Sequence, residues 1–238
     1  MSPQEALVSV RDVVKDYQAL RPLRIEELRI GRGDVVSVMG LDAAAAEMLV
    51  GLLTGAVLPD SGEVRLFGQA TRDVTDSDAW LAMLDGVGIV TDRAVLIGQF
   101  SVEQNIAMPF TLAVDPVADE VRPRVAALAA DVGLIPGDLK TRVAEARPEV
   151  QARVRVARAL ALNPSLLLVE HPSATLPRES VKPFAAALAR VAQARTLAVL
   201  AITADEAFAS GLGGRVLQHE PVTGALRARA SWRKLFGR

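Results

Sequence analysis

Short apolar runs alternate along the chain with longer segments of helical spacing. The runs occupy residues 34–39, 87–90, 166–169 and 196–202. Each is rich in Val, Ile or Leu and has the length of a strand, as in parallel strands that are buried on both faces. Residues 6–14, 24–30 and 63–67 instead alternate apolar with polar side chains, which predicts half-exposed antiparallel strands. The pattern predicts an α/β fold, with a mostly parallel sheet flanked by helices and an N-terminal antiparallel β-subdomain.

The middle of the chain has the spacing of helices rather than strands. Candidate helices lie near residues 101–109, 117–133 and 148–162, and the pattern is broken at Pro109, Pro136 and Pro148. We interpret residues 96–162 as a helical subdomain inserted into a core made of residues 6–95 and 163–220. A basic tail at residues 221–238 completes a single predicted domain.

Composition excludes several classes of function. The 27 basic and 28 acidic residues nearly cancel, so nucleic acid is not an expected partner. With no Cys and two His, neither a disulfide framework nor a metal site is predicted. No stretch reaches the roughly 20 uncharged residues of a membrane-spanning helix. The first residues also lack the pattern of a secretory leader, and we therefore expect a cytoplasmic protein.

Several segments share the order and spacing of one known family. Residues 40–55 (GLDAAAAEMLVGLLTG) with 58–64 (LPDSGEV) resemble the phosphate-loop region of ABC-transporter ATPases. Residues 105–109 resemble the helix after the family's Q-loop, residues 157–164 the helix before Walker B, and residues 166–172 Walker B itself. Because the order is kept over residues 6–220, the chain resembles an ABC ATPase subunit with its P-loop-NTPase-like core. Subunits of bacterial importers and of lipid-trafficking systems are the most similar.

The phosphate loop departs from the family pattern G-x-x-x-x-G-K-[ST]. In that pattern backbone amides and the lysine hold the phosphates, and the hydroxyl holds magnesium. Gly40 is kept, but Ala45, Ala46 and Glu47 replace the second glycine, the lysine and the hydroxyl residue. Since consecutive alanines favour helix, we predict that the helix starts early, with Asp42 as its N-cap.

The catalytic positions implied by the resemblance are also altered. Asp92 stands at the Q-loop glutamine, Glu170 at the magnesium-linked aspartate of Walker B, His171 at the catalytic glutamate, and Ala204 at the switch histidine. The plainer interpretation of Glu170 and His171 is a structural pair at the end of a strand, and that of Asp92 and Arg93 is a loop.

The remaining positions implied by the resemblance follow the same trend. Arg147, Pro148 and Glu149 stand in the signature, where Pro148 removes an amide and Glu149 would repel a phosphate. Arg147 also reads as a solvated helix charge. Tyr17 stands where an aromatic ring stacks on adenine, although a partly exposed strand aromatic is the simpler interpretation.

These departures predict a pseudo-ATPase that needs no cofactor and acts as a scaffold, a regulatory subunit or a permease-docking subunit, in a lipid or solute transport system. Its partners would be an ABC permease, a second ABC ATPase, or a copy of itself as a homodimer. Residues 95–109 follow the family pattern of the permease-docking surface, and helical-subdomain core is the alternative. Residues 226–238 combine five basic residues with Trp232, Leu235 and Phe236, a composition suited to peripheral contact with the inner membrane; a solvated, frayed terminus is the alternative.

Two other functions remain open from the sequence. One is an unorthodox but active ATP-binding subunit that uses ATP and magnesium, with Glu170 for the metal and Arg147 for phosphate. The other is a stand-alone module whose alanine-lined cleft binds a different ligand.

Overall fold

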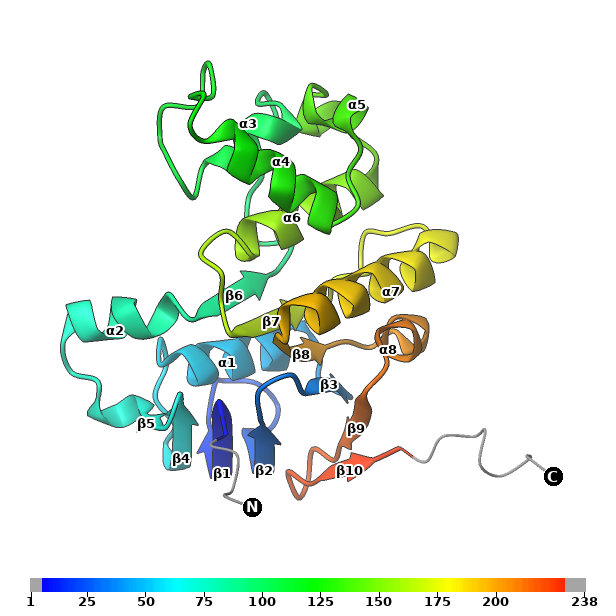
Figure 1. Ribbon diagram of the computed structural model, residues 1–238. Helices are drawn as coiled ribbons and strands as arrows, with labels where there is room; N and C mark the ends of the chain where they lie inside the picture. Colours follow the sequence, from blue (N-terminus) through cyan, green and yellow to red (C-terminus); the bar gives the residue numbers. More distant parts are fainter. Residues whose placement is uncertain (1–5, 230–238) are drawn as a thin grey trace.

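An antiparallel sheet forms the N-terminal side of the molecule in the computed structural model, which describes residues 6–229 (Figure 1). Its strands are β1 (Val8–Lys15), β2 (Leu23–Ile30), β4 (Ser61–Leu66) and β5 (Gln69–Ala70), in the order β2-β1-β4-β5. On β2, Leu23, Ile25, Leu28 and Ile30 are buried and the residues between them are exposed. The predicted half-exposed antiparallel strands are confirmed.

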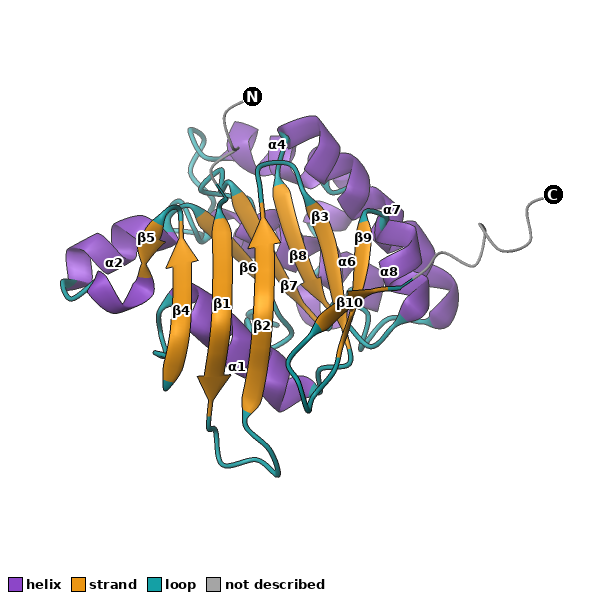
Figure 2. Ribbon diagram, turned by 90° about the horizontal axis from the view of Figure 1, so that it is seen from below, coloured by secondary structure: helices purple, strands orange, loops and turns teal. Residues whose placement is uncertain are grey.

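A second, six-stranded sheet carries the predicted buried strands. Its members are β3 (Val35–Met39), β6 (Val87–Val90), β7 (Leu166–Glu170), β8 (Ala198–Ile202), β9 (Arg215–His219) and β10 (Leu226–Ala228), in the order β10-β9-β3-β8-β7-β6 (Figure 2). All neighbours pair in parallel except β9 and β10. Every residue of β7 and β8 is buried, as continuous apolar runs require.

Helices cover the parallel sheet on both faces. They include α1 (Ala43–Thr54), α2 (Ser77–Leu84), α7 (Arg178–Arg195) and α8 (Glu206–Leu212). Two short 3-10 turns lie elsewhere: η1 (Thr71–Asp73) follows β5, and η2 (Val143–Glu145) precedes the helix that begins at Pro148. Alternate residues of β7 belong to different cores. Leu166 and Leu168 pack with α1 and the antiparallel sheet, whereas Leu167 and Val169 pack with α7, α8 and the helix α6 (Pro148–Ala159). The parallel sheet is thus the layer that both cores share.

The helical block comprises α3 (Val102–Ala107), α4 (Arg122–Asp131), α5 (Pro136–Leu139) and α6 (Pro148–Ala159), and stands beyond the edge strand β6 (Figure 1). The helix predicted near residues 117–133 begins only at Arg122, because Val117 pairs with Val114 in an isolated bridge and Pro123 fits only the first turn. The helix predicted to reach residue 162 ends at Ala159, ahead of Asn163, whose φ is 54°, and Pro164.

The buried Asn105 ties the start of the helical block to the loop before it. Its Oδ1 accepts from the backbone N–H of Ile97 (2.9 Å), and its Nδ2 donates to the carbonyls of Ile97 (3.1 Å) and Ser101 (3.0 Å). Ser101 caps α3 in a capping box with Gln104. The loop that leads from the sheet into α3 is therefore held by side-chain hydrogen bonds.

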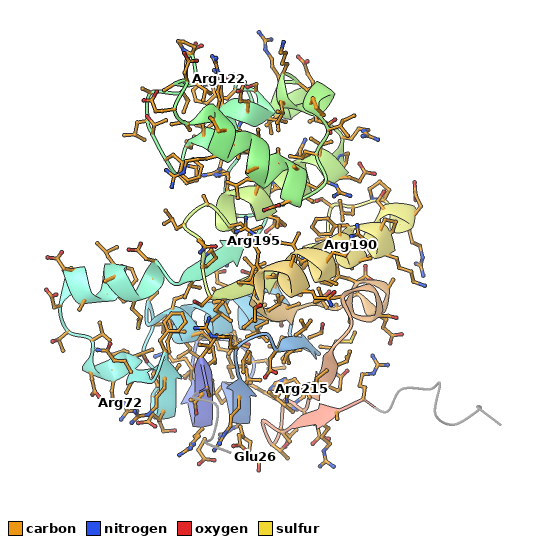
Figure 3. The ribbon with its side chains drawn as sticks, in the orientation of Figure 1. Glu26, Arg72, Arg122, Arg190, Arg195 and Arg215 are labelled. Carbon is orange, nitrogen blue, oxygen red and sulfur yellow. The ribbon has the colours of Figure 1, made fainter. Side chains whose placement is uncertain are left out.

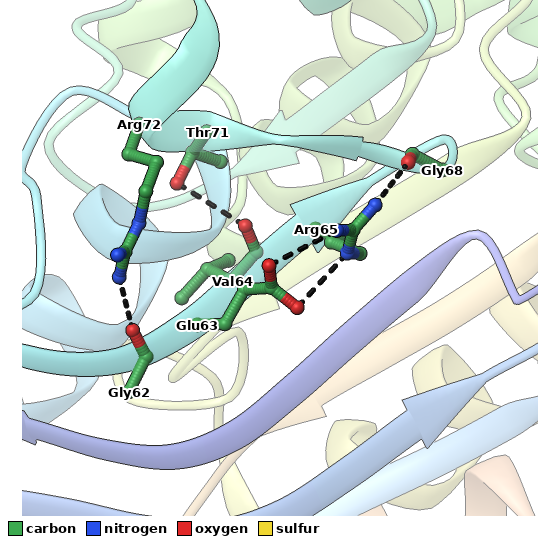
Figure 4. A network of polar contacts seen from close by, with 7 residues as sticks. All are labelled: Gly62, Glu63, Val64, Arg65, Gly68, Thr71 and Arg72. Carbon is green, nitrogen blue, oxygen red and sulfur yellow. Dashed lines mark hydrogen bonds and ion pairs between the residues drawn. The ribbon is translucent and has the colours of Figure 1, made fainter.

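Ion pairs and hydrogen bonds connect elements at the surface of the molecule. At the end of α7, Arg195 contacts Asp131 of α4 at 2.5 Å, and so joins the helical block to the sheet layer (Figure 3). Along β4, Arg65 holds both carboxylate oxygens of Glu63 at 2.9 and 3.0 Å, and Arg72 donates to the carbonyl of Gly62 (Figure 4).

The predicted basic tail is in part a strand. Residues 226–228 form β10, and Arg229 pairs with Glu206 at 2.9 Å. The rest of the tail, residues 230–238, and residues 1–5 lie outside the described residues. Within residues 6–229 no helix combines the length and the apolar character that a membrane span requires.

Replacing Asn105 by Ala should lower the free energy of unfolding by about 3 kcal/mol, because several buried backbone groups lose their partner together. Urea denaturation followed by circular dichroism measures this loss. Gln193→Ala on the exposed face of α7 is the matched control, and should change stability by less than about 0.5 kcal/mol. Equal stability of the two variants would contradict the role given to Asn105.

Candidate functional site

The candidate site lies at one edge of the parallel sheet. Strands β3, β6, β7 and β8 run parallel, so their carboxyl ends meet at the same edge. The segments that follow these ends contain most of the residues singled out by the resemblance: Gly40–Glu47, Asp92, Glu170–His171 and Ala204. Parallel-sheet proteins bind ligands at such an edge.

Helix α1 begins where the sequence predicts, directly after this edge. Asp42 is its N-cap, and its side chain accepts from the backbone N–H of Ala45 at 2.8 Å. The backbone N–H of Ala46 donates to the carbonyl of Asp42 at 2.9 Å. The predicted early start is confirmed. As a result the amides of Ala45 and Ala46 are engaged by Asp42 and are not free to bind a phosphate.

Two alanines of the first turn, Ala45 and Ala46, belong to the core, whereas Ala43 and Ala44 are exposed. Ala46 has an exposed fraction of 0%, and Ala45 is also buried, in the same cluster as Leu49. Gly40 has a φ of 91°, and a Cβ at that position would lie 2.3 Å from Nε2 of Gln218. Glycine is therefore needed there by the fold itself, whether or not a phosphate binds.

One guanidinium joins two carboxylates at the centre of the site. Arg93, in the loop after β6, contacts Glu170 at the end of β7 at 2.5 Å with one nitrogen, and contacts Glu47 on α1 with another. The exposed side-chain fractions are 63% for Glu47, 41% for Arg93 and 6% for Glu170. Burial raises the pKa of Glu170, and the charge of Arg93 opposes this shift.

Glu170 ends β7 and His171 follows it directly, so the two residues do stand together at the end of a strand. Glu170 pairs with Arg93, and the described residues contain no hydrogen bond between Glu170 and His171. Arg93 was interpreted as a plain loop residue because its partner lies 77 positions away in the sequence. The only signal that could have found it was its place beside Asp92, at the family's Q-loop position.

His171 is held by its backbone rather than by its side chain. Its N–H donates to the carbonyl of Ile202 at 2.8 Å, its φ is 40°, and its Nε2 is buried without a hydrogen-bond partner in the described structure. The ring lines a small cavity together with Asp92, Arg155 and Phe184. His171 and Asp92 thus meet at this cavity.

The signature positions lie apart from these groups. Pro148 is the first residue of α6, Arg147 precedes it as an exposed N-cap residue, and Glu149 accepts from the Ser180 hydroxyl at 2.5 Å. This hydrogen bond lowers the pKa of Glu149. Arg147 and Glu149 border a groove of about 290 Å³ between α6 and α7, for which Arg153 and Phe184 form further walls. No hydrogen bond or ion pair between described residues connects them to Glu47 or Glu170.

Two further positions flank the site. Tyr17 is half-buried against the core that contains α1, and burial together with the nearby charge of Asp42 raises its pKa. Ala204 is exposed after β8, next to the buried Thr203, whose hydroxyl accepts from the backbone N–H of Asp205 at 3.0 Å. Asp205 is in turn the N-cap of α8.

Sequence comparison finds relatives among ATP-binding proteins of bacterial transporters, whereas no family model matches the chain. The methionine import ATP-binding protein MetN of Brucella abortus is 28% identical over 214 residues, which are 89% of this chain and 56% of that protein. The lipoprotein-releasing system ATP-binding protein LolD of Psychrobacter arcticus is 26% identical over 184 residues, or 77% of this chain and 81% of that protein. The chain spans about half the length of the methionine import relatives that it matches.

Solved structures share the fold. The structure of cbiO1 from Clostridium perfringens, described as part of the ABC transporter complex cbiONQ, has a TM-score of 0.79 at 18% identity and covers 98% of this chain and 91% of that chain. The dimeric structure of the bacterial ABC transporter cassette MJ0796 has a TM-score of 0.76 at 22% identity. It covers 93% of this chain and 97% of that chain. At these identities the likeness establishes the ABC ATPase cassette fold. Together with the sequence relatives, it shows that this chain belongs to the family of ABC transporter ATP-binding subunits.

Proposed function

We propose that this chain is a catalytically degenerate ABC ATPase subunit that does not hydrolyse ATP and acts as a scaffold, regulatory or permease-docking component. The observation that supports this most is the start of α1. Asp42 accepts from the amides of Ala45 and Ala46, and Ala46 is wholly buried where the family places a lysine. A triphosphate would meet neither the amide cradle nor the cation that neutralises it.

Charge at the site supports the same conclusion. Glu47 brings a carboxylate to the position of the magnesium-binding hydroxyl, and Arg93 is shared between Glu47 and Glu170. A guanidinium engaged by two carboxylates has less attraction left for a phosphate. Removal of one preorganised donor from a catalytic site costs roughly 10²–10³ in rate, so the joint loss of lysine, hydroxyl and amides removes most of an ATPase's catalytic power.

The proposed partners are a permease and a second ATPase subunit, which a copy of this chain could provide. The solved structures of similar fold are described as part of a transporter complex and as a dimer, respectively, and this supports both partner classes. Val95, at the start of the predicted docking surface, is 75% exposed, whereas Val102 and Ile106 are buried in the core. The docking role therefore falls on the loop ahead of α3, at the cytoplasmic face of the inner membrane.

The proposed cargo class is a lipid or a small solute. The relatives named above are a methionine importer subunit and a lipoprotein-releasing subunit. Their names describe those proteins, and they support the choice of a lipid or solute system for this chain without deciding between the two.

Purified protein should bind no ATP up to millimolar concentration, with or without magnesium, because the phosphate cradle is filled by helix. Isothermal titration calorimetry measures binding, and phosphate release measures turnover. Micromolar affinity for ATP would contradict the proposal. Magnesium-dependent turnover that Glu170→Ala abolishes would establish an active, unorthodox ATPase instead.

The double variant Ala46→Lys with Glu47→Ser should not gain tight ATP binding, although it restores the family's residue types. Residue 46 faces the core, so the lysine should instead lower the free energy of unfolding by about 2 kcal/mol or more. Calorimetry with ATP and urea denaturation measure the two effects. Glu47→Ser alone is the control, since its side chain is exposed. Micromolar binding by the double variant would show that the helix start does not close the site.

A further inference from the structure

We propose that Arg93 is a built-in cation that stands in place of a divalent metal ion at this site, so that the chain itself supplies the positive charge between Glu47 and Glu170. This inference deepens the proposed function and rests on it. It concerns the charges of the protein without nucleotide rather than ATP binding or hydrolysis. It can therefore be tested with a metal ion alone.

The geometry is that of one cation between two acids. Glu47 lies in the first turns of α1, Glu170 ends β7, and Arg93 follows β6, so three separate elements contribute. Two different guanidinium nitrogens serve the two carboxylates, with 2.5 Å between Nη2 of Arg93 and Oε2 of Glu170. Charge-assisted contacts of this length are among the stronger polar contacts in proteins.

Burial makes a counter-charge necessary at Glu170. Its side chain is only 6% exposed, and a buried carboxylate is costly unless a cation or several donors face it. A guanidinium is suited to this place because it stays protonated throughout the ordinary pH range. Arg93 therefore supplies a permanent positive charge where the family pattern relies on a metal that arrives with nucleotide.

Magnesium does not fit beside this arginine. It requires nearly octahedral oxygen ligands at about 2.0–2.1 Å. Here the carboxylate oxygens that would face it already contact guanidinium nitrogens, and the position of the hydroxyl ligand holds Glu47. In the described part of the chain no group of three or more His, Cys, Asp or Glu side chains is arranged to hold a metal. Glu47 and Glu170 form a site for a cation, and the guanidinium of Arg93 occupies it.

Two further contacts hold the loop after β6. The backbone N–H of Arg93 donates to the hydroxyl of Thr91 at 3.3 Å, and Arg158 of α6 donates to the carbonyl of Val95 at 2.8 Å. Together with the contact between Arg93 and Glu170, they connect this loop to the end of β7 and to α6.

The test uses Arg93→Gln, which removes the charge and keeps much of the side-chain length. Wild-type protein should bind no Mn²⁺ and should melt at the same temperature with and without it. The variant should melt about 3–6 °C lower, because Glu170 is left buried without its counter-charge. Millimolar Mn²⁺ should restore most of that loss, and electron paramagnetic resonance should detect the bound ion. The double variant Arg93→Gln with Glu170→Gln should show neither binding nor restoration by the metal.

Arg122→Gln is the matched control. Arg122 also faces two acids, at 2.7 Å from Asp119 and 3.8 Å from Glu103, but on the exposed surface of the helical block (Figure 3). Its loss should neither lower the melting temperature by more than about 1 °C nor create Mn²⁺ binding. If Arg93→Gln does not yield folded protein, as judged by circular dichroism, Arg93→Lys serves instead. The lysine should still prevent Mn²⁺ binding, but because its side chain is shorter, the melting temperature of this variant should be lower than that of the wild type.

Two results would overturn the inference while leaving the proposed function intact: Mn²⁺ binding by the wild type as tight as by Arg93→Gln, or a folded Arg93→Gln variant that neither binds Mn²⁺ nor melts lower. A third result would overturn both. If the wild type binds ATP and Arg93→Gln abolishes that binding, Arg93 is a phosphate ligand and the chain is a nucleotide-binding subunit.

Discussion

The cap that Asp42 places on α1 is the interaction on which the rest of the site depends. By accepting from the N–H of Ala45, its carboxylate commits the chain to helix within three residues of Gly40. An N-cap of this kind contributes about 1 kcal/mol. Its structural consequence is larger than that figure suggests, because the amides of the first turn, which could have faced a ligand, become part of the helix. Ala45 and Ala46 can then pack into the core between the two sheets.

The charge arrangement follows from where the helix starts. With α1 in this register, Glu47 is exposed on the side facing the loop after β6, and Arg93 reaches both it and the end of β7. The parallel sheet brings these groups together, since its strands end side by side at one edge. A buried acid such as Glu170 would be costly on its own, and the arginine supplied by the neighbouring strand's loop offsets part of that cost. The result is a site in which one guanidinium of the chain faces both acids.

The two cores explain why such a change leaves the cassette fold intact. Alternate side chains of β7 pack on opposite faces of the sheet, so α1 and the helical block are stabilised by separate clusters. Ala46 contributes to the cluster beneath α1, whereas Asn105 organises the entry to the helical block. The ATP-binding positions can therefore change while the order of strands and the fold of the relatives persist.

What the sequence determined by itself is local or periodic. Continuous apolar runs predicted the parallel sheet, because a strand buried on both faces is apolar at every residue. Alternating patterns predicted the antiparallel sheet, because a strand buried on one face is apolar at every second residue. The cap at Asp42 was predictable for a similar reason, since donor and acceptor lie three residues apart. Only the tertiary structure decided the rest. The contact of Arg93 with Glu170 spans 77 positions and that of Ser180 with Glu149 spans 31, and a single sequence carries no signal for which distant charges the folded chain brings together.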